Sequence, residues 1–190
     1  MYEHRPEKTK EDSGEPVPAG CRRIYLAGGC FWGTERIFRM LDGVRETRTG
    51  YVNGTLENPR YEDVMRRNTG FRETVRVTYD PGEVSLKTIL QAYYLCIDPE
   101  NEDGQAGDKG EQYRAGIYYR NEEDLPIIRE VSDEERRKHD RFFVEISPLR
   151  NFYTAEEYHQ NYLEKIPDGY CHITAVDLEK VRKLNKNGNL

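Results

Sequence analysis

The most constraining feature of this chain is the short segment from Gly28 to Cys30, which joins two different hydrophobic patterns. An apolar run from Ile24 to Ala27 precedes the segment and predicts a strand, and apolar residues at helical spacing follow it (Ile37, Phe38, Leu41). Paired glycines permit a tight turn between the two elements. The order therefore predicts a strand, a turn and a helix start, with Cys30 at the positive end of the helix dipole, where a thiolate is favoured.

Two large aromatic residues, Phe31 and Trp32, come directly after this cysteine and are suited to walling an apolar pocket. A nucleophilic sulfur beside an apolar pocket indicates covalent chemistry on a small apolar group. The structural alternative is a buried cysteine between two core aromatics, because a free cysteine often packs as a small hydrophobe. The pentapeptide alone leaves both interpretations open.

The chain as a whole suits one soluble domain. Its 190 residues carry a net charge of −6, with basic and acidic residues interleaved and no basic stripe, which argues against a nucleic-acid partner. No apolar run approaches the roughly 20 residues of a membrane span, and Met1 to Ala19 lacks the apolar core of a secretory signal. We therefore expect a cytoplasmic protein with a flexible arm over residues 1–20, a catalytic domain over 21–176 and a helical tail over 177–190.

The four cysteines are Cys21, Cys30, Cys96 and Cys171, and none forms a Cys-x-x-Cys pair. We therefore expect no metal site, and in a reducing cytoplasm no permanent disulfide framework. Cys96 lies at the edge of an apolar helical stripe without an activating charge, so it is predicted to be a packing residue. Cys171 follows a Pro-Asp-Gly break, in a segment that we expect to be mobile.

Strand and helix patterns alternate along the chain without regular βαβ spacing. Strands are expected at 22–27, 44–51, 73–79, 113–119 and 142–146, and helices at 32–41, 61–67, 85–97, 121–138 and 177–187. Thr154 and Glu157 predict a capping box for a helix that ends near Lys165. The Asn53-Gly54 turn favours antiparallel pairing. The fold class is therefore α+β, a mixed and mainly antiparallel sheet with packed helices, like a ferredoxin-like α/β roll.

Glu73 is unusual because alternation along its strand places it on the same face as Val75, Val77 and Tyr79. A carboxyl group on an apolar face is desolvated, which favours its protonated form. The alternative is a glutamate at a strand end whose side chain reaches solvent. The long polar loop from Pro99 to Glu111 is of a kind that is often functional.

Seven ordered motifs between Arg23 and Cys171 resemble those of the A-type peptide-methionine sulfoxide reductases. They are specific, because one contains a Cys-Phe-Trp triplet and all seven keep the order of the family. The motifs are Gly29-Cys30-Phe31-Trp32-Gly33, Gly50-Tyr51-Val52-Asn53-Gly54, Tyr61-Glu62-Asp63-Val64, Thr69-Gly70-Phe71-Arg72-Glu73, Val77-Thr78-Tyr79-Asp80-Pro81, Gly107-Asp108-Lys109-Gly110 with Gln112-Tyr113-Arg114, and Tyr158-His159-Gln160.

The resemblance implies a reaction with a nucleophile, an acid and hydrogen-bond donors. Cys30 would attack the sulfur of an S-configured methionine sulfoxide, peptide-bound or free, in an oxidised protein or peptide. Tyr51 and Tyr113 would hold the sulfoxide oxygen, and Glu73 would protonate it. Asp108 would shape the site through hydrogen bonding.

The resemblance also implies how the substrate fits and how the enzyme is recycled. Phe31 and Trp32 would receive the methyl group. Loss of methionine would leave Cys30 as a sulfenic acid, which Cys171 would resolve as a disulfide. Thioredoxin or a similar dithiol protein would reduce that disulfide, without a metal or bound cofactor.

Three features depart from the family pattern. Phe71 stands where the family commonly has histidine, and Arg72 would lower the pKa of Glu73 if it pointed inward. The loop has Gln105-Ala106-Gly107 where Gln-Gly-Asn is usual. No cysteine follows Cys171, which argues against a two-step disulfide relay, and Cys21 is an alternative resolving thiol.

Two other classes of function remain open from the residues themselves. A thiol hydrolase or transferase would pair Cys30 with His159 and would need a histidine within hydrogen-bond reach of the sulfur. In a helix with Tyr158 and Tyr162, His159 is more simply a structural residue. A non-catalytic module would recognise methionine-rich or oxidised segments through the two aromatic residues after Cys30.

Overall fold

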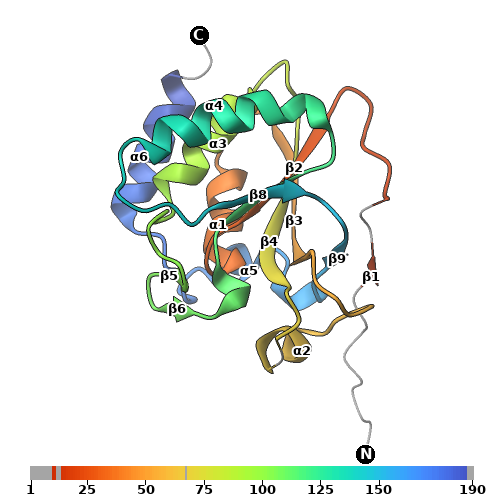
Figure 1. Cartoon of the computed structure of the whole chain (residues 1–190). Coiled ribbons are helices and arrows are strands. Elements are labelled where there is room, and N and C mark those ends of the chain that lie inside the picture. Colours follow the sequence, from red (N-terminus) through yellow and green to blue (C-terminus); the bar gives the residue numbers. More distant parts are fainter. Residues whose placement is uncertain (1–9, 12–13, 67, 188–190) are drawn as a thin grey trace, which may run out of the picture.

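The computed structural model describes residues 10–11, 14–66 and 68–187, which fold around one seven-stranded sheet (Figure 1). The strand order is β1-β9-β3-β4-β2-β7-β8. Every pairing is antiparallel except that of β7 with β8. The strands are β1 (Lys10–Glu11), β2 (Arg22–Ala27), β3 (Val44–Val52), β4 (Arg72–Tyr79), β7 (Gly116–Tyr119), β8 (Glu145–Pro148) and β9 (Phe152–Thr154).

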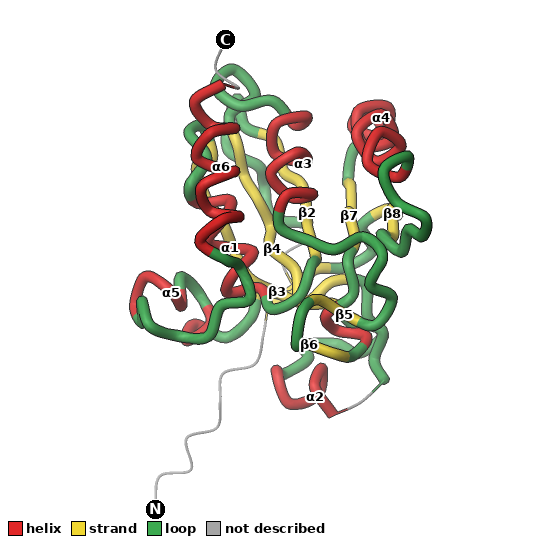
Figure 2. Tube along the Cα trace, turned by 90° about the vertical axis from the view of Figure 1, so that its left-hand side faces the viewer, coloured by secondary structure: helices red, strands yellow, loops and turns green. Residues whose placement is uncertain are grey.

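The centre of the fold is a βαββαβ unit, which confirms the predicted α+β class with a mainly antiparallel sheet. Its chain order is β2, α1 (Phe31–Arg39), β3, β4, α3 (Leu86–Leu95) and β7. Figure 2 shows α1, α3 and α6 (Ala175–Asn187) on one face of the sheet. Both α6 and α4 (Leu125–Arg136) pack against α3.

The remaining elements are short. They are α2 (Tyr61–Arg66), α5 (Tyr162–Lys165), the hairpin of β5 (Gly104–Gln105) with β6 (Asp108–Lys109), and the 3-10 turns η1 (Glu111–Tyr113), η2 (Glu122–Asp124) and η3 (Glu157–His159). In both views, α2 lies at the end of the sheet opposite α4 (Figures 1 and 2).

Alternation along β4 divides its side chains between the two faces of the sheet, as predicted. Val75, Val77 and Tyr79 belong to the large core beneath the helices. On the opposite face the Arg76 guanidinium is fully buried and pairs with Glu15 Oε2 at 2.6 Å and Glu46 Oε2 at 3.1 Å. Glu15 also accepts from Arg23, so the segment around Glu15 is joined to this face by ion pairs. Whether residues 1–20 form a flexible arm stays a prediction, since residues 1–9 and 12–13 lie outside the described part.

Several local predictions were wrong. Tyr113 ends the 3-10 turn η1, and the strand expected from residue 113 begins only at Gly116. Thr154 ends β9, so it does not cap a helix, and η3 with the one-turn α5 replaces the continuous helix. In both segments the sequence fits a regular strand or helix pattern, but contacts with distant parts of the chain determine the backbone conformation.

Smaller differences concern element ends. Pro126, which lies inside the helix expected over 121–138, stands in the first turn of α4, where its missing N–H costs no hydrogen bond. The polar loop from Pro99 contains the β5–β6 hairpin. None of the helices in the described part of the chain combines the length and the hydrophobicity that a membrane span requires.

Candidate functional site

Cys30 is the N-cap residue of α1, so the predicted strand, turn and helix start are confirmed. Cys30 is only 8% exposed. Burial and the nearby Glu73 carboxylate raise the pKa of the Cys30 thiol, although hydrogen bonds from the backbone N–H groups of Trp32 and Gly33 act in the opposite direction. The predicted preference for thiolate was therefore wrong for the free enzyme, because desolvation outweighs the helix terminus.

Glu73 is buried beside this cysteine, with an exposed fraction of 2%, and is the second residue of β4. Its Oε2 accepts a hydrogen bond of 3.1 Å from the backbone N–H of Phe31. Burial raises the pKa of Glu73 to about 8, with a smaller upward contribution from Asp108, and the bond from Phe31 opposes the shift. The interpretation of Glu73 as a desolvated acid, rather than a solvent-facing strand end, is confirmed.

The Tyr51 hydroxyl is fully buried and already has a partner. It donates to Glu156 Oε2 at 2.9 Å, while Glu156 Oε1 accepts from the backbone N–H of Tyr61 at 2.8 Å. Burial, and then the Glu156 and Glu73 charges, raise the pKa of Tyr51 well above its usual value. Tyr51 is therefore a neutral donor, and Glu156 fixes the direction of its hydroxyl.

Tyr113 and Asp108 approach the same site from the loop side. The Tyr113 hydroxyl lies 3.6 Å from Met65 Sδ, and a hydrogen bond also links Tyr113 with Tyr61. Burial, and then the Glu73 charge, raise the pKa of Tyr113, so this phenol is neutral too. Asp108, on β6, adds to the raised pKa of both Cys30 and Glu73, and its Oδ2 accepts from the Tyr170 hydroxyl at 3.0 Å.

Phe31 and Trp32 form the aromatic side of the site, with His159 between them. The His159 ring centroid lies 5.0 Å from that of Phe31 and 5.7 Å from that of Trp32. His159 Nδ1 accepts from Trp32 Nε1 at 3.1 Å, and burial lowers the pKa of His159 to about 4. On its other side Trp32 stacks on Tyr162 at 3.7 Å between ring centroids.

This arrangement bears on the hydrolase hypothesis. None of the hydrogen bonds among the described residues joins His159 to Cys30, and the nitrogen of His159 that has a partner is used by Trp32. His159 therefore has the structural role that its aromatic neighbours indicated, which is to hold the indole in place.

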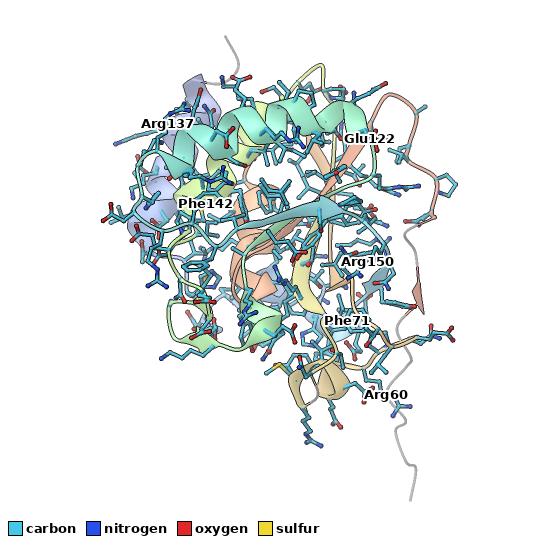
Figure 3. All side chains as sticks on the ribbon, viewed as in Figure 1. Arg60, Phe71, Glu122, Arg137, Phe142 and Arg150 are labelled. Atoms are coloured by element: carbon cyan, nitrogen blue, oxygen red, sulfur yellow. The ribbon has the colours of Figure 1, made fainter. Side chains whose placement is uncertain are left out.

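The structure also shows where Phe71 and Arg72, the two residues before Glu73 that depart from the family pattern, are placed. Arg72 points away from the acid, since its Nη1 donates to Ala115 O at 3.1 Å and pairs with Glu145 Oε2 at 2.6 Å. Phe71 is buried at the end of the sheet near α2 (Figure 3), with its ring centroid 6.5 Å from that of Tyr51. Phe71 thus packs against the tyrosine, and Arg72 does not oppose the raised pKa of Glu73.

All four cysteines are free thiols. Cys171 is partly buried, and its Sγ lies 3.7 Å from Ile173 O. Cys96 is the C-cap of α3 and packs on the core, and burial raises its pKa to about 12, as expected for a packing residue. In the described part of the chain, no group of three or more histidine, cysteine or acidic residues is placed to hold a metal ion.

Sequence reasoning missed two functional neighbours, Glu156 and Tyr61. Glu156 is 8% exposed and accepts hydrogen bonds from Tyr51 and Tyr61. Nothing in the sequence singles out Glu156, because only the pairing of β3 with β9 brings it to Tyr51. The available signal for Tyr61 was its place in one of the seven motifs.

Comparisons with known proteins agree with this site. The family model described as "Peptide methionine sulfoxide reductase" matches residues 22–189. A relative from Clostridium acetobutylicum, named "Peptide methionine sulfoxide reductase MsrA", is 49% identical over 160 residues, which make up 84% of this chain and 99% of that protein.

Solved structures share the fold. The crystal structure of Mxr1 from Saccharomyces cerevisiae in reduced form has a TM-score of 0.78 and 34% identity, covering 87% of this chain and 95% of that one. Mxr1 in complex with Trx2 has a TM-score of 0.55 and 26% identity, covering 78% of this chain and 88% of that one.

Proposed function

Because the chain belongs to the peptide methionine sulfoxide reductase family and is an oxidoreductase of the MsrA type, we propose that it reduces the S epimer of methionine sulfoxide through Cys30. The substrate would be peptide-bound in oxidised proteins, or free. The observation that carries the proposal is the Glu73 carboxyl, which is held by the backbone of Phe31 directly after the nucleophile and has a pKa of about 8.

The reaction requires transfer of a proton to the sulfoxide oxygen and attack of a nucleophile on the sulfoxide sulfur. Glu73 is largely protonated at neutral pH, so it is able to give its proton to the sulfoxide oxygen as Cys30 Sγ bonds to the substrate sulfur. The thiol proton of Cys30 returns to Glu73. The oxygen then bonds to Cys30 Sγ, while the substrate sulfur loses both its bond to this oxygen and its bond to Sγ. The products are methionine and a Cys30 sulfenic acid, so atoms and electrons balance.

Neutral phenols assist this proton transfer. Tyr51 and Tyr113 both have raised pKa values and therefore keep their protons to donate to the oxygen. Tyr51 would exchange its bond with Glu156 for one with the substrate. Asp108 would orient the site by hydrogen bonding from the opposite side.

Selectivity for one epimer would arise because three groups of residues approach the substrate sulfur from different sides. Cys30 supplies the attack, Glu73 and the phenols hold the oxygen, and Phe31 with Trp32 receives the methyl group. A change of one methylene in such an apolar pocket alters discrimination by about 1–3 kcal/mol. Exchange of oxygen and methyl in the other epimer would place a polar atom against the aromatic rings.

Cys171 would then resolve the sulfenic acid, and a dithiol protein of the thioredoxin type would reduce the resulting disulfide. The neighbour Tyr170 is already hydrogen-bonded to Asp108, which ties this segment to the site. The solved complex of Mxr1 with Trx2 supports a thioredoxin partner. The scheme uses residues 21–176 for catalysis and no metal or bound cofactor.

A single turnover tests the proposal. Pre-reduced enzyme is mixed with the S epimer of N-acetyl methionine sulfoxide amide without reductant, and methionine and thiols are counted before disulfide mapping. One equivalent of methionine and a Cys30–Cys171 bridge are expected. The C171S variant should still form methionine but no bridge, C30S should form none, and C21S is the matched control that should behave as the unmodified enzyme.

No methionine under these conditions would reject the proposed reaction. Methionine with a bridge from Cys30 to Cys21 would keep the chemistry and reject the assignment of Cys171.

A further inference from the structure

The segment around Cys171 touches the active site on both sides of the cysteine. Before it, the Tyr170 hydroxyl donates to Asp108 Oδ2 at 3.0 Å. After it, the imidazole of His172 lies against the first turn of α1, where Cys30 is the N-cap. Cys171 is therefore the residue between two attachment points.

The second attachment depends on two glycines that flank the nucleophile. A Cβ atom added at Gly29 would lie 3.1 Å from both Cε1 and Nε2 of His172, and one added at Gly33 would lie 3.1 Å from Nδ1. Both distances are tighter than ordinary contact. The imidazole therefore fills a space that is open because neither residue has a side chain.

Packing rather than charge holds this ring. Both ring nitrogens are shielded from solvent and have no hydrogen-bond partner among the described residues. Burial lowers the pKa of His172, so the ring is neutral, although Asp108 of β6 and Asp177 of α6 act in the opposite direction. The contact is thus one of shape between an aromatic ring and the glycine backbone.

We propose that His172 is a positioning residue for the resolving step, whose ring holds the adjoining Cys171 beside the start of α1. This inference rests on the proposed function. In that step Cys171 Sγ attacks Cys30 Sγ, the S–O bond of the sulfenic acid breaks, and hydroxide leaves with the Cys171 thiol proton as water. Holding one sulfur near the other raises its effective concentration, which changes the rate of this step alone.

Step-resolved kinetics of the full chain test the proposal, using the same single turnover. The variants are His172→Ala, which removes the ring, and His172→Phe, which keeps a ring and removes both nitrogens. His139→Ala is the matched control, since His139 interacts with Glu135 and Glu100 away from the site. Methionine is measured in quenched samples, the disulfide by mass spectrometry, and the sulfenic acid by trapping with dimedone.

We expect His172→Ala to form its first methionine within about twofold of the unmodified rate, because Cys30 and Glu73 are unchanged. Its Cys30–Cys171 bridge should form at about one tenth of the unmodified rate or more slowly. The Cys30 sulfenic acid, detected by its reaction with dimedone, should persist longer. His172→Phe should restore bridge formation to within about threefold, since the ring shape is kept.

Each other result overturns the inference in a distinguishable way. A bridge that forms at the unmodified rate in His172→Ala rejects positioning. A His172→Phe variant as slow as His172→Ala would assign the effect to the nitrogens, and equal loss of both steps would assign it to folding of the whole site. If the unmodified enzyme forms methionine but no Cys30–Cys171 bridge, the assignment of Cys171 and this inference fail while the reduction stands. If it forms no methionine, the proposed function itself fails.

Discussion

Glu73 accepts a hydrogen bond from the backbone N–H of Phe31 at 3.1 Å, so the buried acid is attached to the residue that follows the nucleophile. The same helix start thereby places Cys30 and the acid in fixed relation. A carboxyl with a pKa of about 8 in this position is a proton donor at neutral pH. The pairing explains how the chain combines a thiol of raised pKa with proton delivery in one apolar site.

The rate of methionine formation should depend on the proton of Glu73. In single turnovers we expect the rate constant to fall as the pH rises through about 8, because the acid is then ionised. Glu73→Gln should lower the rate constant by a factor of about 10²–10⁴ and should abolish its pH dependence. The control is Glu157→Gln, whose side chain is largely exposed. An unchanged rate in Glu73→Gln would falsify the assignment of Glu73 as the acid.

Stability should fall with pH because of the same residue. The pKa of Glu73 rises from 4.5 to about 8 on folding, so between these values the folded state binds more protons than the unfolded state. The free energy of unfolding should therefore decrease across this window, by roughly 4–5 kcal/mol at most. Glu73→Gln should lack that decrease. Urea unfolding at several pH values measures the difference between the two proteins, and a constant difference would contradict the buried-acid interpretation.

Removing His159 should impair substrate binding more than chemistry. His159→Phe leaves the indole N–H of Trp32 without its acceptor, which costs about 1–3 kcal/mol and loosens the aromatic wall. We expect the substrate concentration for half-maximal single-turnover rate to rise about tenfold, with a smaller change at saturation. His139→Phe serves as control. Complete loss of methionine formation at saturating substrate would instead show a direct chemical role for His159.

Tyr51 and Glu156 should be energetically coupled. A double-mutant cycle with Tyr51→Phe and Glu156→Gln should give a coupling of about 1–2 kcal/mol in urea unfolding, because the buried hydroxyl donates to the carboxyl at 2.9 Å. The cycle of Tyr51→Phe with Glu157→Gln is the control and should be additive. Additivity in the first cycle would mean that Glu156 does not orient the Tyr51 hydroxyl.

Local patterns predicted much of this fold because they reflect burial. The alternation along β4 identified its buried face, including Glu73, and the glycines before Cys30 identified the turn into α1. A strand with one core face has little freedom of register, so its pattern is informative. The helix expected from residue 85 likewise begins there, since Ser85 is the N-cap of α3 and its hydroxyl accepts from the backbone N–H of Thr88.

The same patterns failed where long-range contacts decide the backbone. Thr154 and Glu157 have the spacing of a capping box, yet Thr154 pairs with Gly50 in the sheet, and the next residues turn to bring Glu156 under Tyr51. Spacing along the chain contains no information on this partner. The prediction for Tyr113 failed similarly, since a 3-10 turn carries it to the site.

The sequence by itself determined the α+β class, the strand and helix around Cys30, and the family through seven motifs. The tertiary structure alone decided the protonation of the Cys30 thiol. A helix start favours a thiolate, but burial beside Glu73 raises the pKa of Cys30, and the same burial raises that of Glu73 to about 8. Desolvation depends on everything packed around a group, and those neighbours are brought together only by folding.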